Sequence, residues 1–133
     1  MIAPILIVED DADIRSGVAE VLREEGYEVA TAAHGAEALE WLRTGNSASL
    51  ILLDLMMPVM DGWEFRCEQL QDPRAARIPV VVLSGAGDVG QHASSLGADG
   101  FLVKPLNLDE LFGAAERYCK SSSASKVQST AGA

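Results

Sequence analysis

Four short apolar runs in the chain each end in residues with charged or reactive side chains. The runs and the residues that follow them are 5–8 with Glu9 and Asp10, 50–53 with Asp54, 80–83 with Ser84 and Gly85, and 101–103 with Lys104. If the runs are strands of an open parallel sheet, their carboxyl ends meet at one edge, where such sheets bind ligands. The sequence therefore predicts one pocket that contains three carboxylates, a hydroxyl group and an amine.

These residue types fit the chemistry of phosphoryl transfer. Three neighbouring carboxylates repel one another unless they are protonated or bind a cation, and a site of oxygen ligands and water suits Mg²⁺. Carboxylates are known nucleophiles toward phosphorus and form aspartyl phosphate. The oxygens of a transferred phosphoryl group must be held in place and their charge neutralised. Beside the metal, Lys104, Ser84 and the backbone N–H of Gly85 could contact these oxygens. The pattern indicates a phosphoacceptor site with Asp54 as the acceptor.

Strands and helices alternate along the chain and would position these residues. The predicted strands are 4–9, 27–31, 50–55, 78–83 and 99–103, and the five predicted helices fill the segment between strands one and two and then 35–43, 62–71, 88–96 and 108–119. Four of the strands are continuous apolar runs, which is typical of burial on both faces of a parallel sheet. The alternation predicts an α/β, doubly wound, flavodoxin-like fold with the strand order 2-1-3-4-5.

Single residues of the pattern also have ordinary structural explanations. An Asp at a strand end is often solvated or caps a helix, and Asp11 and Asp13 are expected to cap the first helix, as Asn107 is expected to cap the last. Ser84 alone would be a turn residue. The combination of residues on four strand ends is much more specific than any one of them.

Composition limits the class of protein. The chain has 133 residues, 48% hydrophobic residues and a net charge of −10, which fits one globular domain. No apolar stretch approaches the roughly 20 residues of a membrane span, and no cluster of basic residues suggests nucleic-acid binding. We expect a cytoplasmic protein whose two cysteines are reduced. Residues 120–133 are rich in Ser and Ala and are expected to form a disordered tail.

Four motifs resemble those of response-regulator receiver domains of two-component signalling, in particular single-domain receivers of the chemotaxis type. The motifs are ILIVEDD, LILLDLMMPVMDGWEF, VVVLSG and GADGFLVKP, in that order. The resemblance implies that residues 1–119 form a receiver domain. It also implies that a sensor histidine kinase or a histidine phosphotransfer protein phosphorylates Asp54 with Mg²⁺ as cofactor, and that the signal passes to a downstream protein through protein contacts.

The resemblance further assigns the metal ligands. Asp10 and Asp54 are expected to bind Mg²⁺ directly, and the backbone carbonyl of Met56 is expected to be a third ligand from the protein. Glu9 is expected to act mainly through metal-bound water.

The resemblance also assigns the phosphoryl contacts and a conformational switch. Ser84 and Lys104 contact the phosphoryl group, and the Lys104–Pro105 peptide is expected to be cis. Movement of Ser84 toward the phosphoryl group makes room for the aromatic ring of Phe101 to turn inward. The alternative for Phe101 is that its ring is simply packed inside the protein. The segment between Ser84 and Lys104 is shorter than in many members, which favours a monomer or a weak dimer.

Three alternatives remain at the level of sequence. The chain could be a receiver cut from a hybrid histidine kinase or a longer regulator. A Mg²⁺-dependent phosphatase with an aspartyl-phosphate intermediate is disfavoured, because Met56 stands where such enzymes place a second Asp. An FMN-binding flavodoxin is disfavoured because acidic residues follow the first strand and would repel a phosphate. We therefore do not expect an enzyme.

Overall fold

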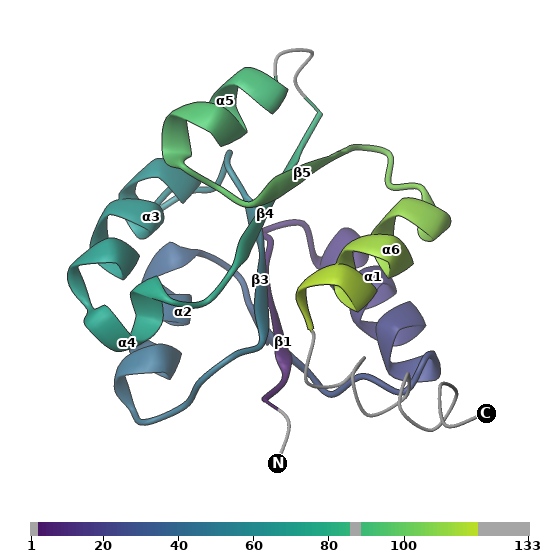
Figure 1. Cartoon of the computed structure of the whole chain (residues 1–133), viewed down its shortest axis with the longest axis horizontal. Helices are drawn as coiled ribbons and strands as arrows, with labels where there is room; N and C mark the ends of the chain where they lie inside the picture. The colour runs from purple at the N-terminus through teal and green to yellow at the C-terminus, as the bar shows by residue number, and fades with distance from the viewer. Residues whose placement is uncertain (1–2, 86–88, 120–133) are drawn as a thin grey trace.

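A five-stranded parallel sheet forms the centre of the molecule. The computed structural model describes residues 3–85 and 89–119. The strands are β1 Ile5–Val8, β2 Val29–Ala32, β3 Leu50–Asp54, β4 Val80–Ser84 and β5 Gly100–Val103. Their order is β2-β1-β3-β4-β5 and all neighbouring pairs are parallel (Figure 1). This confirms the predicted fold class and strand order.

Helices cover both faces of the sheet. They are α1 Ala12–Glu24, α2 Gly35–Arg43, α3 Gly62–Gln71, α4 Pro73–Ala76, α5 Val89–Leu96 and α6 Leu108–Tyr118. In Figure 1, α1 and α6 lie on one side of the sheet and the other four lie on the opposite side. The layers are those of a doubly wound α/β domain.

The described residues contain six helices where the sequence predicted five. The additional helix, α4, is a single turn in the segment between the predicted helix 62–71 and the predicted strand 78–83. Asp72 caps it by accepting hydrogen bonds from the backbone N–H groups of Arg74 and Ala75, and Pro73 occupies its first turn. Proline suits that position because its missing N–H needs no partner there, and Pro73 accordingly starts this short helix.

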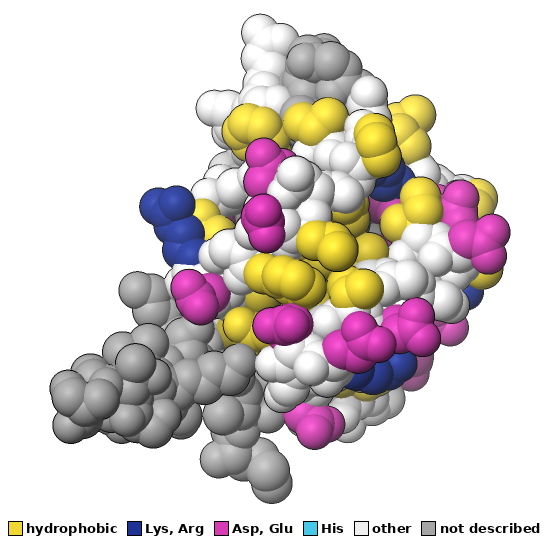
Figure 2. Space-filling view, turned by 90° about the vertical axis from the view of Figure 1, so that its right-hand side faces the viewer, with side chains coloured by type: hydrophobic (Ala, Val, Ile, Leu, Met, Phe, Trp, Pro, Cys, Tyr) yellow, Lys and Arg dark blue, Asp and Glu magenta, His cyan; other side chains and the backbone are white. Residues whose placement is uncertain are grey.

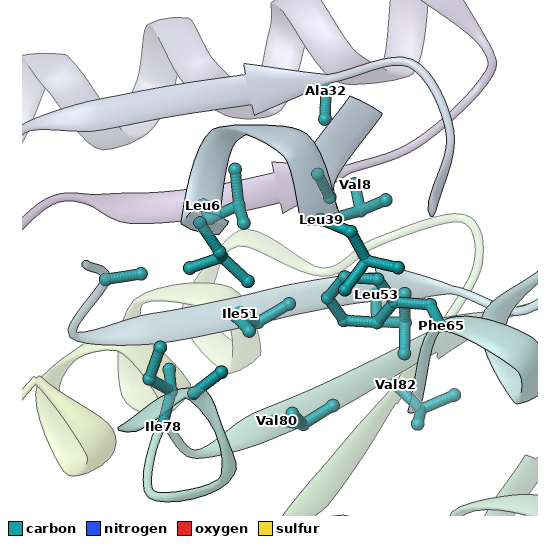
Figure 3. Close-up of a cluster of buried hydrophobic side chains, with 14 of the residues drawn as sticks. Leu6, Val8, Ala32, Leu39, Ile51, Leu53, Phe65, Ile78, Val80 and Val82 are labelled. Atoms are coloured by element: carbon teal, nitrogen blue, oxygen red, sulfur yellow. The ribbon is translucent and has the colours of Figure 1, made fainter. Parts of the chain in front are cut away.

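Two hydrophobic clusters hold the layers together. Side chains of alternating residues along β1, β3 and β4 point to opposite faces of the sheet, as strand geometry requires. One set, including Leu53 and Val82, packs against Phe65 of α3 and Leu39 of α2 (Figure 3). The other set packs against α1 and α6. Burial on both faces explains why these strands read as continuous apolar runs.

Two strands, β2 and β4, begin two residues later than the sequence predicted. Tyr27 donates its backbone N–H to Leu22 O, so it belongs to the turn that ends α1, where Gly26 has φ +95°. Ile78 donates to Ala75 O and closes the turn after α4. Hydrophobicity alone assigns Tyr27 and Ile78 to strands. In the structure, hydrogen bonds to the end of the preceding helix hold both residues in turns, so the strands start after them.

Two of the three predicted helix caps are confirmed. Asp11 caps α1 by accepting from the N–H groups of Asp13 and Ile14, and Asn107 caps α6 by accepting from the N–H of Glu110. Asp13 is not a cap, because it lies inside the first turn of α1. Its negative charge there still favours the helix through the helix dipole.

Glycines allow the segment after β3 to pack closely against the sheet. A Cβ atom on Gly62 would lie 2.8 Å from Asp54 O and from the Cα of Leu55. A Cβ on Gly35 would lie 2.9 Å from the side chain of Met60. The start of α3 therefore packs directly on the backbone around Asp54, and the start of α2 packs on Met60 in the segment after β3.

The surface that carries α1 and α6 is predominantly acidic. Hydrophobic side chains form a patch there, with acidic side chains around it and few basic ones (Figure 2). The half-buried hydrophobic residues of α1 and α6 include Ile14, Val21 and Phe112.

Among the described residues, no helix is long and apolar enough to cross a membrane. The predicted disordered tail, residues 120–133, lies outside the described residues.

Candidate functional site

Three carboxylates meet at the carboxyl ends of β1 and β3. Glu9 and Asp10 follow β1, Asp54 is the last residue of β3, and one oxygen from each lies within 4.8 Å of the others. Glu9 is fully buried and Asp54 is 3% exposed, whereas Asp10 is exposed to solvent. Because β1 and β3 are adjacent strands at the switch point of the sheet, the fold itself brings these residues together.

Lys104 reaches the carboxylates from the end of β5. Its Nζ lies 2.8 Å from Glu9 Oε1 and 3.4 Å from Asp54 Oδ1. The Lys104–Pro105 peptide is cis, as the resemblance implied. The backbone N–H of Lys104 donates to Ser84 O at 2.9 Å, which joins the ends of β4 and β5. The structure thus places the predicted amine against two of the predicted carboxylates.

Ser84 and Gly85 lie beside Lys104 at the end of β4. Ser84 is 3% exposed and stands opposite Val103 in the parallel register. A Cβ atom on Gly85 would lie 4.0 Å from the Cβ of Lys104. Both residues therefore lie next to Lys104, and their predicted contacts with a phosphoryl group remain predictions.

Backbone hydrogen bonds hold the acidic segment after β1. Asp11 donates its N–H to Glu9 Oε2 at 3.2 Å. Arg15 Nη1 donates to Glu9 O at 2.8 Å and to Asp10 O at 3.4 Å. Sequence reasoning does not identify this role of Arg15, because the contact depends on how the first turn of α1 folds back on the end of β1.

Burial and mutual repulsion raise the pKa of Asp54. The pKa of Asp54 rises from 3.8 to about 7, mainly because the group is buried and next because Glu9 is negatively charged; Lys104 opposes the rise. For Lys104, burial lowers the pKa, but the hydrogen bond with Glu9 and the charge of Asp54 outweigh burial, so that the net pKa is raised. The protein alone therefore does not neutralise this cluster of acids.

The residues present fit a Mg²⁺ ion. The carboxylates of Glu9, Asp10 and Asp54 supply hard oxygen ligands, and the exposed Asp10 leaves the pocket open to water, which Mg²⁺ usually retains. A divalent cation would also relieve the repulsion that raises the pKa of Asp54. The predicted ligand role of the Met56 carbonyl remains a prediction. The backbone N–H of Met56 donates to Asp54 Oδ1 at 3.4 Å.

The segment after β3 contains a strained residue that sequence reasoning missed. Val59 has φ +70°, and Met60 N donates to Pro58 O at 2.7 Å across it. This is the rare γ-turn with positive φ, which is unfavourable for a β-branched residue. The side chain of Val59 is 78% exposed, so its packing does not compensate for the strain. The strain lies between β3, which ends at Asp54, and α3.

We expect Val59→Gly to stabilise the protein. A residue held in this backbone region costs about 1–3 kcal/mol, while glycine costs about 0.5–1 kcal/mol in extra chain entropy, so the net gain should be about 1 kcal/mol. Val59→Ala is the matched control, because it removes the side chain but keeps the Cβ atom and should change stability little. Urea unfolding of the three proteins tests the prediction, and equal effects of Gly and Ala would contradict it.

Phe101 does not lie in the acidic pocket or in the core. The residue is on β5 opposite Val82, and its side chain is 48% exposed. A Cβ atom on Gly90 of α5 would lie 3.4 Å from its ring. The interpretation that Phe101 is simply packed inside is therefore wrong. Its predicted role as a switch remains a prediction, and the ring has the outward position from which such a switch would start.

The family model for the response regulator receiver domain matches residues 5–116. The chain therefore belongs to the family of response regulator receiver domains, which act in two-component systems. This confirms the resemblance that the four sequence motifs indicated.

Several known proteins are similar to the chain. The transcriptional regulatory protein PrrA of Mycobacterium tuberculosis is 42% identical over 111 residues, which are 80% of this chain and 46% of PrrA. The chain spans about half the length of the curated relatives it matches, from 42% to 54%.

Two solved structures show the same fold. The chemotaxis protein CheY4 of Vibrio cholerae has a TM-score of 0.79 with 34% identity and covers 89% of this chain and 99% of its own. The response regulator TrrA of Thermotoga maritima, solved in complex with Mg²⁺-BeF, has a TM-score of 0.77 with 34% identity and covers 87% of this chain and 98% of its own.

Proposed function

We propose that this chain receives a phosphoryl group on Asp54 from a sensor histidine kinase or a histidine phosphotransfer protein, with Mg²⁺ as cofactor. One observation carries the proposal: the buried carboxylate of Asp54 lies with Glu9, Asp10 and Lys104 at the carboxyl edge of the sheet. A phosphoacceptor needs this combination of a nucleophile, oxygen ligands for a metal and a fixed positive charge. The similar TrrA structure with Mg²⁺-BeF supports the same assignment.

Asp54 supplies the nucleophile. An oxygen of its carboxylate forms the new P–O bond while the donor's bond to phosphorus breaks and the donor keeps that electron pair. Bound Mg²⁺ would supply positive charge for the phosphoryl oxygens. Because the pKa of Asp54 is about 7 without a cation, the reactive carboxylate form is favoured by a pH above that value or by metal binding.

Lys104 and Ser84 hold the phosphoryl group in this proposal. The ammonium of Lys104 is 3.4 Å from Asp54 Oδ1 and is held in place by Glu9, so it can pair with an added phosphoryl oxygen without a large movement. Ser84 supplies a buried hydroxyl donor at the end of β4. The backbone N–H of Gly85 adds a further donor.

Signalling to a downstream protein would follow from a difference in conformation between the unphosphorylated and the phosphorylated chain. Phosphorylation can shift the conformational equilibrium only through contacts that differ between the states. Ser84 and Lys104 provide such contacts at the ends of β4 and β5, and the exposed ring of Phe101 against α5 is the element that would respond. The chain would thus signal through a downstream protein and would not act as an enzyme with turnover.

Intact-mass measurement with a small phosphodonor tests the proposal. The wild type should gain one phosphoryl group with acetyl phosphate and Mg²⁺ and none after chelation with EDTA. Asp54→Asn should gain none, because it lacks the nucleophile. Asp72→Asn, which changes the half-buried cap of α4 and none of the residues of the acidic pocket, is the matched control and should behave as the wild type.

Two outcomes would contradict the proposal. One is a phosphoryl gain on Asp54→Asn equal to that of the wild type. The other is an unmodified wild type with acetyl phosphate and also with a phosphorylated histidine phosphotransfer protein. Rapid, continued release of inorganic phosphate from simple phosphate esters would instead indicate a phosphatase.

A further inference from the structure

A second polar pocket lies at the opposite end of the sheet from Asp54. It has a volume of about 470 Å³ and is lined by residues just before β4 and β5 and near the end of α6. Its charged residues are Arg66, Arg77, Arg117 and Asp99. Because all strands are parallel, residues that precede β4 and β5 lie at the amino edge of the sheet, away from the acidic pocket. The two pockets share no residue.

The charge of this pocket is opposite to that of the whole chain. The chain has 20 acidic and only 10 basic residues, yet three arginines and one aspartate line the pocket. Asp99 Oδ2 already accepts a hydrogen bond from Val80 N at 2.8 Å, which ties this carboxylate to the backbone. The pocket therefore has an excess of two positive charges in a protein with a strongly negative surface.

Arg66 is a buried and rigid part of the pocket. Its side chain donates to Leu96 O at 3.0 Å, to Gly97 O at 2.8 Å and to Gln69 Oε1 at 2.9 Å. The residue is only 8% exposed, and burial lowers its pKa. A guanidinium has five N–H donors, so two remain beyond these three hydrogen bonds. A fixed, desolvated cation with donors available is a favourable anchor for an anion.

The other two arginines are available to a ligand. Within residues 3–85 and 89–119, neither Arg77 nor Arg117 forms a hydrogen bond through its side chain or an ion pair. Arg117 Cζ lies 5.6 Å from the centre of the Tyr118 ring, a cation–π contact that restrains the guanidinium. Tyr118 is itself fixed, because its hydroxyl donates to Asp99 O at 2.8 Å. The pocket thus combines one buried guanidinium with two exposed ones.

We infer that this pocket binds a phosphate dianion, either free or as part of a phosphomonoester. Planar guanidinium groups match the oxygens of phosphate with paired hydrogen bonds. A phosphomonoester carries about −1.5 to −2 charges at neutral pH, which balances the excess of two positive charges. The volume falls within the usual range for small-molecule sites. Ile78 and Pro79 also line the pocket and offer an apolar wall to an organic substituent.

Titration of the ¹⁵N-labelled full chain by NMR tests this inference. The probes are inorganic phosphate and phenyl phosphate, added without Mg²⁺ at constant ionic strength, with sodium chloride as the reference. We expect saturable shifts of the Arg66 Nε–H signal and of the backbone signals of Gly97 and Asp99. Tighter binding of phenyl phosphate would indicate a phosphomonoester as the ligand, and equal binding would indicate free phosphate.

Removal of the two exposed arginines should weaken binding without unfolding the protein. The double variant Arg77→Gln, Arg117→Gln should lose affinity for either probe by about tenfold or more, because charge-assisted hydrogen bonds are removed. Arg43→Gln is the matched control, since Arg43 is exposed and pairs with Glu68 away from the pocket. The inference is overturned if wild-type shifts match those caused by chloride, or if the double variant binds as well as the wild type.

Discussion

Asp54→Asn is expected to stabilise the metal-free protein, and the gain should increase as the pH rises. In the folded protein the pKa of Asp54 is about 7, against 3.8 as its unperturbed value. A group whose pKa is raised on folding contributes most to stability below its unfolded pKa, and that contribution is lost as the pH rises toward the folded pKa. The wild type should therefore lose stability between about pH 4 and pH 7.

Asn does not titrate, so the variant lacks this loss. From the shift in pKa, and allowing for the coupling with Glu9, the variant should be more stable by on the order of 2–4 kcal/mol above the folded pKa, with little difference near the unfolded one. Lys104 keeps its contact with Glu9 in the variant, so the substitution should not leave the charge of Glu9 unpaired.

Urea unfolding in EDTA across this pH range measures the effect. Addition of Mg²⁺ should raise the stability of the wild type, because a ligand that binds only the folded state stabilises it, and should raise that of Asp54→Asn much less. Parallel pH profiles of the two proteins in EDTA would show that Asp54 does not carry the raised pKa.

Lys104→Met should destabilise the metal-free protein strongly. The substitution leaves Glu9 and Asp54, both buried, without the cation that lies 2.8 Å and 3.4 Å from their oxygens. Breaking a buried ion pair by removing one partner costs about 3–5 kcal/mol. The cost should be largest above pH 7, where Asp54 is ionised, and smaller at acidic pH, where protonation removes the repulsion.

Two controls make this prediction specific. Lys104→Arg keeps the positive charge and should lose much less stability. Mg²⁺ should restore a large part of the stability of Lys104→Met, since the metal would supply the missing positive charge. Thermal unfolding with EDTA and with Mg²⁺ measures both effects. If Met and Arg cost the same and Mg²⁺ restores nothing, the loss comes from packing of the lysine stem and not from charge.

Sequence alone determined the fold and the location of the acidic pocket. Strands that are buried on both faces must consist of continuous apolar runs. Connections between parallel strands through a helix are almost always right-handed, so the alternation of strands and helices predicts a parallel sheet with helices on both faces. These two constraints place the carboxyl ends of all strands at one edge. Glu9, Asp10, Asp54 and Lys104 stand directly at those ends, so their proximity followed without knowledge of any side-chain position.

Other features depended on contacts between residues far apart in the chain, which local patterns do not encode. The direct pairing of Lys104 with the buried Glu9 and the outward position of the Phe101 ring are of this kind. So is the contact of Arg66 with the end of α5, thirty residues further along. The short helix α4 and the strained turn at Val59 depend on backbone geometry that packing around them imposes. Hydrophobic periodicity determines which elements form, but only the assembled layers decide which polar groups meet between them.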